Sequence, residues 1–226
     1  MISHRHQCIF IHIHKTAGTA IEKKLGHFEE LAPGVQDHRL LSELEPYSLR
    51  TLLSRARRSG WDARRLAREW RSYRHQELTP KQYQTYFKFA FVRNPWHRVF
   101  SWYCNVMEDE DHRRVESKVR TPGRRVPDDC TFKQFVIEFG SDWPLRPQLD
   151  WLRDSRGNLA MDFIGRFENL EQDFAHVGGK LGIRDQTLPK MMLREWFGEE
   201  NPFDSEIADI IYERYKEEIL MFGYHL

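Results

Sequence analysis

Two short apolar segments, each followed at once by a turn and a helix-like pattern, constrain the fold of this chain most strongly. Residues 8–13 (CIFIHI) are β-branched and aromatic, and they run into the small residues of KTAGT. Residues 86–92 (YFKFAFV) form a second such segment, which ends at Arg93-Asn94-Pro95. Apolar runs of this length between turn signals are typical of strands buried on both faces of a sheet. The chain is therefore predicted to be an α/β protein.

The rest of the chain alternates in the same way. A third strand is expected at 161–167, and no internal repeat is present. Strands that alternate with helices favour a three-layer domain with a central, mainly parallel sheet flanked by helices. A single domain over 1–226 is expected, with an Arg-rich helical insert at about 47–74. Helices are predicted at 17–28, 97–107, 131–139, 168–182 and 203–224. Irregular segments are predicted at 108–130, at 144–158 and at 29–46, where there is room for one turn of helix.

The charged residues are unevenly distributed, although the net charge of the whole chain is only +1. Residues 1–130 hold 24 basic and 16 acidic side chains, whereas residues 131–226 hold 11 basic and 18 acidic. The stretch 50–74 alone carries nine arginines against Asp62 and Glu69. The near-zero total argues against a general nucleic-acid binder, while an arginine-rich first half suits recognition of anions through forked hydrogen bonds.

The cysteines and the apolar runs bear on where the protein is found. Cys8, Cys104 and Cys130 form no CxxC pair, and this argues against a disulfide framework or a zinc site. The longest apolar runs are far shorter than the ~18 residues of a membrane span. The first residues (MISHRHQ) lack the apolar core of a signal peptide. These features predict a soluble, cytoplasmic protein or the soluble catalytic part of a longer one, and they leave its oligomeric state open.

The loop after the first strand has the chemistry of a phosphate cradle. Residues 14–19 (HKTAGT) lie between a predicted strand and a predicted helix, where α/β sheets bind their ligands. Small residues let the backbone close around an anion, Lys15 adds a positive charge, and Thr16 and Thr19 add hydroxyl donors. An ordinary turn with a surface lysine is the alternative, and the loop alone does not exclude it. The Walker A pattern GxxxxGK[ST] is absent.

A second anion site is predicted where the next strand ends. Arg93 follows that strand directly, and Ser101 lies two turns into the following helix. Both side chains can face the same crevice, where the arginine would grip a phosphate by a bidentate fork and the serine through its hydroxyl. Either residue alone is equally compatible with a structural role.

Together the two motifs resemble those of a known family. FIHIHKTAGTAIEKKLG and FKFAFVRNPWHRVFSWY resemble the 5′-phosphosulfate loop and the 3′-phosphate motif of sulfotransferases that use 3′-phosphoadenosine 5′-phosphosulfate (PAPS). The carbohydrate branch, with its bacterial members and the heparan sulfate 2-O-sulfotransferase type, is the most similar. DFIGRFENLEQDF and the terminal helix that ends in FGY also resemble segments of that branch.

The resemblance implies a P-loop-like fold and an activity. A sulfuryl group would move from PAPS to an acceptor hydroxyl by in-line displacement, without a metal, and the acceptor is expected to be a carbohydrate rather than a nucleic acid. Lys15 would stabilise the leaving phosphate of adenosine 3′,5′-bisphosphate. The residues expected to bind PAPS are Lys15, Thr16, Ala17, Gly18, Thr19, Ala20, Arg93, Ser101, Arg166 and Phe167.

The acceptor must lose a proton, and a histidine is the expected general base. His75 is the first choice, because its place before the second strand is similar to that of the catalytic histidine in the 2-O-sulfotransferase type. His38 is the second, because the base of the 6-O-sulfotransferase type follows the first helix more closely. Glu77 is a carboxylate alternative. His12 is expected to be a core residue.

The adenine and acceptor sites are less defined by the sequence. Phe167 or Trp96 would stack on the adenine with Arg166 nearby, and Trp143 and Trp151 would line an acceptor cleft. Each of these aromatic residues fits core or surface packing as well.

Three departures from the family pattern bear on these expectations. His14 stands where a proline is commoner, Ala20 lacks a hydroxyl, and neither the insert at 47–74 nor the stretch after Pro189 is typical. Two other functions therefore stay open. One is a nucleotide kinase, which the missing Walker lysine disfavours. The other is a module that binds anionic glycans through 50–74 and has a degenerate PAPS site.

Overall fold

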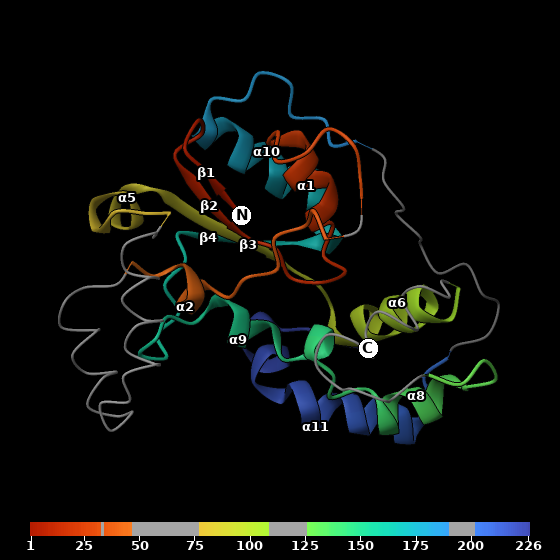
Figure 1. Ribbon diagram of the computed structural model, residues 1–226. Helices are drawn as coiled ribbons and strands as arrows, with labels where there is room; N and C mark the ends of the chain where they lie inside the picture. Colours follow the sequence, from red (N-terminus) through yellow and green to blue (C-terminus); the bar gives the residue numbers. More distant parts are fainter. Residues whose placement is uncertain (33, 47–76, 109–125, 190–201) are drawn as a thin grey trace, which may run out of the picture.

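A four-stranded sheet organises the protein. The computed structural model describes residues 1–32, 34–46, 77–108, 126–189 and 202–226 (Figure 1). Strands β1 (Ile2–Ser3), β2 (Cys8–Ile11), β3 (Phe87–Val92) and β4 (Phe163–Arg166) lie side by side in that order. β1 is antiparallel to β2, whereas β2, β3 and β4 run parallel to one another. The predicted mainly parallel sheet is confirmed.

Helices cover both faces of this sheet, so the predicted three-layer arrangement is also confirmed. One face packs under α1 (Gly18–Lys24) and α10 (Leu170–Leu181), which lie together above the sheet in Figure 1. The opposite face packs on a larger group of helices. That group consists of α2 (Leu41–Leu44), α6 (Pro95–Glu108), α8 (Phe132–Glu138), α9 (Gln148–Leu152) and α11 (Ser205–Phe222).

The central strands are apolar on both sides, as buried parallel strands must be. Phe10 and Phe89 face α1 and α10, while Ile9 and Ile11 face the other helices. All four side chains are fully buried. Strict alternation along β2 and β3 thus divides their side chains between two apolar cores.

Four short elements of the structure were not predicted from the sequence. Residues 144–158 were expected to be irregular, yet they include α9 and part of a 3-10 turn at Trp143–Leu145. Helix α5 (Pro80–Thr85) is held by a capping box, in which Thr79 and Gln82 bond to each other's backbone N–H groups. The signal Thr-Pro-x-Gln for that cap was present in the sequence. β1 has only two residues and carries no periodic signal.

Some expected elements lie outside the described residues. They are the two helices of the Arg-rich insert at 47–74 and most of the loop at 108–130. None of the helices in the described part of the chain has the length and hydropathy of a membrane span.

Candidate active site

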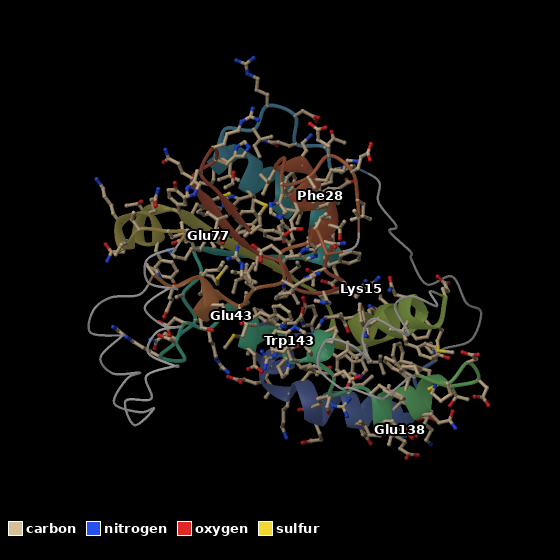
Figure 2. The ribbon with its side chains drawn as sticks, in the orientation of Figure 1. Lys15, Phe28, Glu43, Glu77, Glu138 and Trp143 are labelled. Atoms are coloured by element: carbon tan, nitrogen blue, oxygen red, sulfur yellow. The ribbon has the colours of Figure 1, made fainter. Side chains whose placement is uncertain are left out.

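The carboxyl ends of the three parallel strands lie at one edge of the sheet. Ile11 pairs with Ala90, and Val92 pairs with Arg166, so the loops that follow β2, β3 and β4 leave the sheet together. In open α/β sheets this edge is where ligands bind. Lys15 lies at this edge, between the layer of α1 and helix α6 (Figure 2). The segments with the two predicted phosphate motifs therefore meet in space.

The loop between β2 and α1 has an unusual backbone. Lys15 and Ala17 have φ angles of 67° and 66°, although neither is a glycine. Left-handed backbone of this kind costs a non-glycine residue ~1–2 kcal/mol. Such residues collect at binding and catalytic sites, where the surrounding structure maintains the strain. The conformation also leads directly into the first turn of α1, where the Ala20 and Ile21 N–H groups bond to the Ala17 carbonyl oxygen.

Gly18, the first residue of α1, is required by close packing against a buried histidine. A Cβ atom at this position would lie 1.9 Å from Cδ2 and 2.2 Å from Nε2 of the His12 ring. The ring cannot move away easily, because His12 is only 2% exposed and stacks on Phe10. The strand and the loop therefore fit together only with glycine here.

A Gly18→Ala substitution is expected to destabilise the protein by ~1–3 kcal/mol, because the added methyl group overpacks this contact. Urea unfolding followed by circular dichroism measures the change. Gly179→Ala in α10 is the matched control, since nothing lies within 4 Å of its Cβ position. The control should gain ~0.5–1 kcal/mol from helix propensity. Equal stability of Gly18→Ala and the unaltered protein would show that the contact is not tight.

Arg93 connects the two motifs directly. Its Nη1 donates a hydrogen bond to the Lys15 carbonyl oxygen at 3.2 Å, and its guanidinium lies 4.1 Å from the centre of the Phe167 ring. Burial lowers the pKa of Arg93 to about 10, so the side chain stays positively charged at neutral pH. Among the described residues, the Lys15 carbonyl is the one acceptor that its guanidinium bonds. The other N–H donors can therefore bind an anion.

The remaining loop residues differ in what their side chains do. The Lys15 ammonium donates to Asn105 Oδ1 on α6 at 3.1 Å. Thr16 is fully buried and its hydroxyl donates to the Ile13 carbonyl, so the hydroxyl donor expected from the sequence is used inside the loop. Thr19 lies half-buried on α1, whereas Ala20 is buried. Ser101 is half-buried on α6 and makes no hydrogen bond to a described residue.

The residues expected around the adenine have other contacts. Trp96 is 4% exposed and its indole N–H donates to the Ala208 carbonyl of α11. It packs in the core, so the stacking role is wrong for Trp96. Arg166 donates to the Phe222 carbonyl at 2.6 Å. Phe167, which stacks on Arg93, is the one of these residues that lies against the predicted phosphate site.

Three histidines cluster beside the loop. The His38 ring centre lies 3.7 Å from that of His14 and 4.1 Å from that of His12. His38 Nδ1 is 3.0 Å from the His12 carbonyl oxygen, which can only accept, so Nδ1 carries the proton and Nε2 has a free lone pair. His12 pairs with the buried Glu22 at 3.2 Å. Since His12 is buried beneath the loop, the core role expected for it agrees with the structure.

The other candidate bases are placed differently. His75 lies outside the described residues. Glu77 accepts hydrogen bonds from Arg39 on both carboxylate oxygens, at 2.9 and 3.0 Å. Arg39 also binds Asp37, so this ion-pair network fixes the segment on either side of His38. Both carboxylate oxygens of Glu77 are thus engaged by Arg39, and this ion pair supports the segment that carries His38.

The histidine cluster makes the stability of the fold depend on pH. Burial lowers the pKa values of His12 and His38 to about 3, and it lowers that of His14 well below the ordinary value. The unfolded chain takes up these protons near pH 6.5 and the folded chain does not, so stability is complete above pH 6.5 and falls as the pH drops below it. Burial raises the pKa of Glu22, which offsets part of this loss.

Lowering the pH from 7 to 5 is therefore expected to cost ~2 kcal/mol for His12 alone, since its folded form stays neutral. Urea unfolding at several pH values measures the slope. His38→Asn keeps a donor for the His12 carbonyl but has no basic nitrogen, so its slope should be smaller. A stability that stays constant between pH 7 and 5 would show that these histidines have the same pKa values in the folded protein as in the unfolded chain.

Several residues that hold Arg93 and its surroundings were not among the residues predicted from the sequence. Asn94 caps α6, because its Oδ1 accepts from the Trp96 N–H at 3.1 Å. Arg98 is fully buried and donates to the His14 carbonyl at 3.3 Å. Gln148 binds the Arg93 backbone, and Glu218 binds Gln148. An Asn-Pro pair at a helix start was a readable cap signal, but the other contacts join segments far apart in the chain.

This arrangement combines three features. Lys15 and Arg93 provide positive charge, the loop between β2 and α1 has a strained backbone, and His38 provides a neutral imidazole with an available nitrogen. Lys15 and Arg93 are joined through a backbone carbonyl, so an anion at one is close to the other. In the described residues, no group of three or more His, Cys, Asp or Glu side chains is placed to hold a metal. The site can bind an extended anionic ligand and accept a proton beside it.

Comparison with known proteins agrees with the geometry. The protein-family model described as "Sulfotransferase family" matches residues 1–225 of the chain. Carbohydrate sulfotransferase 11 of Rattus norvegicus and that of Mus musculus are each 25% identical over an alignment of 174 residues, and the match covers 62% of this chain and 47% of each relative. The chain thus spans about half the length of these two proteins.

A third relative is a protein of Archaeoglobus fulgidus with no assigned function. It is 28% identical over 106 residues, which are 47% of this chain and 76% of that protein. No solved structure matches the chain significantly.

Proposed function

The chain belongs to the sulfotransferase family, and on that premise we propose that it transfers a sulfuryl group from PAPS to a hydroxyl group of a carbohydrate. The hydrogen bond between Arg93 and the Lys15 carbonyl is the observation that carries this proposal. It brings together two motifs that lie far apart in the sequence, and each has the chemistry of a phosphate site. PAPS has a phosphate at each end of its ribose and so requires two such sites.

The residues present fit this donor. Arg93 is largely buried, has N–H donors in excess of its single bond to Lys15, and lies against an aromatic face. A buried guanidinium of this kind is stabilised when a phosphate binds to it. The left-handed residues Lys15 and Ala17 curve the loop toward the same edge. We assign the 3′-phosphate to Arg93, with the Ser101 hydroxyl as a second donor, and the 5′-phosphosulfate to residues 15–20.

Lys15 has the charge that the transfer requires. PAPS supplies an activated sulfuryl group, and negative charge develops on the phosphate from which that group departs. A fixed ammonium group near that oxygen stabilises the transition state more than the ground state. The Lys15 ammonium donates a hydrogen bond to Asn105 Oδ1 on α6, which holds the side chain in one orientation before the donor binds.

His38 is the proposed general base among the described residues. Its Nδ1–H is held by the His12 carbonyl, which leaves Nε2 to accept a proton from the acceptor hydroxyl. The segment around it is clamped by the Asp37–Arg39–Glu77 network. Burial keeps His38 neutral, and the negative charge of a bound donor would raise its pKa toward the working range. His75 is the other proposed base.

Transfer of radiolabelled sulfate from PAPS tests the activity. The acceptors should include neutral, uronic-acid-containing and partly sulfated polysaccharides, because the relatives named carbohydrate sulfotransferase 11 point to a carbohydrate but do not specify which. Incorporation into at least one of them, which stops when PAPS is omitted, is the expected result. If PAPS binds and no carbohydrate is labelled, the acceptor class is wrong; if PAPS does not bind, the activity itself is wrong.

The glycan-binding alternative depends on residues 50–74, which lie outside the described residues. The kinase alternative has no support from the site, since Lys15 precedes a loop that lacks the Walker pattern.

A further inference from the structure

Where β3 ends, the side chain of a buried glutamine makes the backbone hydrogen bonds that a neighbouring strand would otherwise make. Gln148, the first residue of α9, is fully buried. Its Oε1 accepts from the Arg93 backbone N–H at 2.8 Å, and its Nε2 donates to the Arg93 carbonyl at 2.8 Å. The last residue pair between β3 and β4 is Val92 with Arg166, and Arg93 is the next residue after it in the chain. The glutamine amide therefore satisfies both backbone groups of Arg93 at once.

A buried carboxylate determines which way that amide faces. Glu218 of α11 is 1% exposed, and its Oε1 accepts from Gln148 Nε2 at 2.9 Å. Its Oε2 accepts from the backbone N–H of the same glutamine. Because the carboxylate accepts both N–H groups, Nε2 must point toward Glu218 and the Arg93 carbonyl, and Oε1 toward the Arg93 N–H. The opposite orientation of the amide would place oxygen against oxygen.

The carboxylate is in turn balanced by a buried arginine. Arg98 Nη1 lies 4.0 Å from Glu218 Oε1, and both side chains are fully buried. The Arg98 Nη2 donates to the carbonyls of Pro144 and Arg146, which lie just before Gln148 in the chain. Its Nε donates to His14 in the loop after β2. The segment of Gln148 is thus anchored on two sides, by α6 and by α11.

We propose that Gln148 and Glu218 are positioning residues, which hold the Arg93 backbone so that its guanidinium faces the 3′-phosphate of the donor. This inference rests on the proposed function. It goes beyond it by assigning recognition of the 3′-phosphate to a network that starts on the C-terminal helix. Neither residue touches the donor, and both act through Arg93. The consequence is specific: loss of the network weakens binding of a nucleotide that has a 3′-phosphate more than one that lacks it.

The experiment compares two nucleotides by isothermal titration calorimetry. Adenosine 3′,5′-bisphosphate and adenosine 5′-monophosphate differ only in the 3′-phosphate, so the ratio of their Kd values isolates the contribution of the site assigned to Arg93 and Ser101. Gln148→Glu keeps the acceptor for the Arg93 N–H but puts an oxygen against both Glu218 and the Arg93 carbonyl. Its preference for the bisphosphate should fall by about 10- to 100-fold, the effect of a lost charge-assisted hydrogen bond.

Glu218→Gln is a second, milder variant, because glutamine has nearly the same shape as glutamate. Its preference for the bisphosphate should fall by about 3- to 10-fold. Glu217→Gln is the matched control, because Glu217 is the neighbouring residue of α11 but is exposed and pairs with Arg153 on the surface. The control should keep the full preference. Thermal unfolding confirms that each variant is folded at the temperature of the titration.

The outcomes separate the two levels of the proposal. If the variants are folded and less stable but keep the preference of the unaltered protein, Gln148 and Glu218 have only a structural role and the inference is wrong. If the unaltered protein itself shows no preference for the bisphosphate, the assignment of Arg93 to the 3′-phosphate is wrong, and the inference fails with it.

Discussion

Replacing Lys15 with alanine is expected to lower kcat for sulfuryl transfer by about 10²–10³-fold, the usual effect of removing one group that stabilises developing negative charge. The Kd for adenosine 3′,5′-bisphosphate should change much less, because the backbone of residues 15–20 and Arg93 remain in place. Alanine has the same Cβ atom as lysine, so the substitution leaves the cost of the left-handed backbone unchanged, and Ala17 already adopts this conformation two residues later. The substitution therefore removes the ammonium group without changing the loop.

Lys24→Ala is the control for this experiment. Lys24 is the last residue of α1 and binds Asp185 at 2.6 Å, away from the loop. Its removal should leave kcat unchanged and should alter the free energy of unfolding by less than ~1 kcal/mol. If Lys15→Ala raised KM for PAPS while kcat stayed the same, Lys15 would bind the donor equally in the ground state and would not have the proposed role.

The second large effect is expected at His38. The His38→Asn variant keeps an N–H donor for the His12 carbonyl but lacks the nitrogen that would accept the proton, so kcat should fall by about 10²–10⁴-fold. Affinity for adenosine 3′,5′-bisphosphate should be preserved, because His38 makes no proposed contact with the nucleotide. Steady-state kinetics and a nucleotide titration on the same preparation separate the two quantities.

His75→Asn is the matched comparison, because the family resemblance made His75 the first choice. If His38→Asn retains kcat and His75→Asn loses it, His38 is a packing residue beneath the loop and His75 is the base. Loss of kcat in both variants would require a second test, in which the solvent isotope effect shows which variant has lost proton transfer.

Much of the fold could be predicted, because the signals for it are local. The apolar runs at 8–11 and 87–92 define buried strands by composition and length, and each leads into a helix through small residues or Pro95. The short helix α9 was missed because five residues after Pro147 contain too few positions to show a helical period. Its role depends on Gln148, whose partners lie in other parts of the chain.

The site was predictable only in part, because some of its contacts join segments that are far apart in the chain. Lys15 and Arg93 were identifiable because each lies next to a strand end, and strand ends meet at one edge of a parallel sheet. The direct bond between Arg93 and the Lys15 carbonyl depends on the left-handed backbone of Lys15, and sequence propensity argues against that conformation. The position of Trp96 could not be predicted either, because an aromatic residue next to a strand end fits both the core and a nucleotide site.

The central claim is that Lys15 and Arg93 form one site for a nucleotide with two phosphate ends. Titration of adenosine 3′,5′-bisphosphate into the unaltered protein, followed by calorimetry, tests it most directly. We expect saturable binding of one nucleotide per chain, weakened at least ~10-fold by Arg93→Met, which loses the forked donor. No binding of the bisphosphate by the folded, unaltered protein would contradict it.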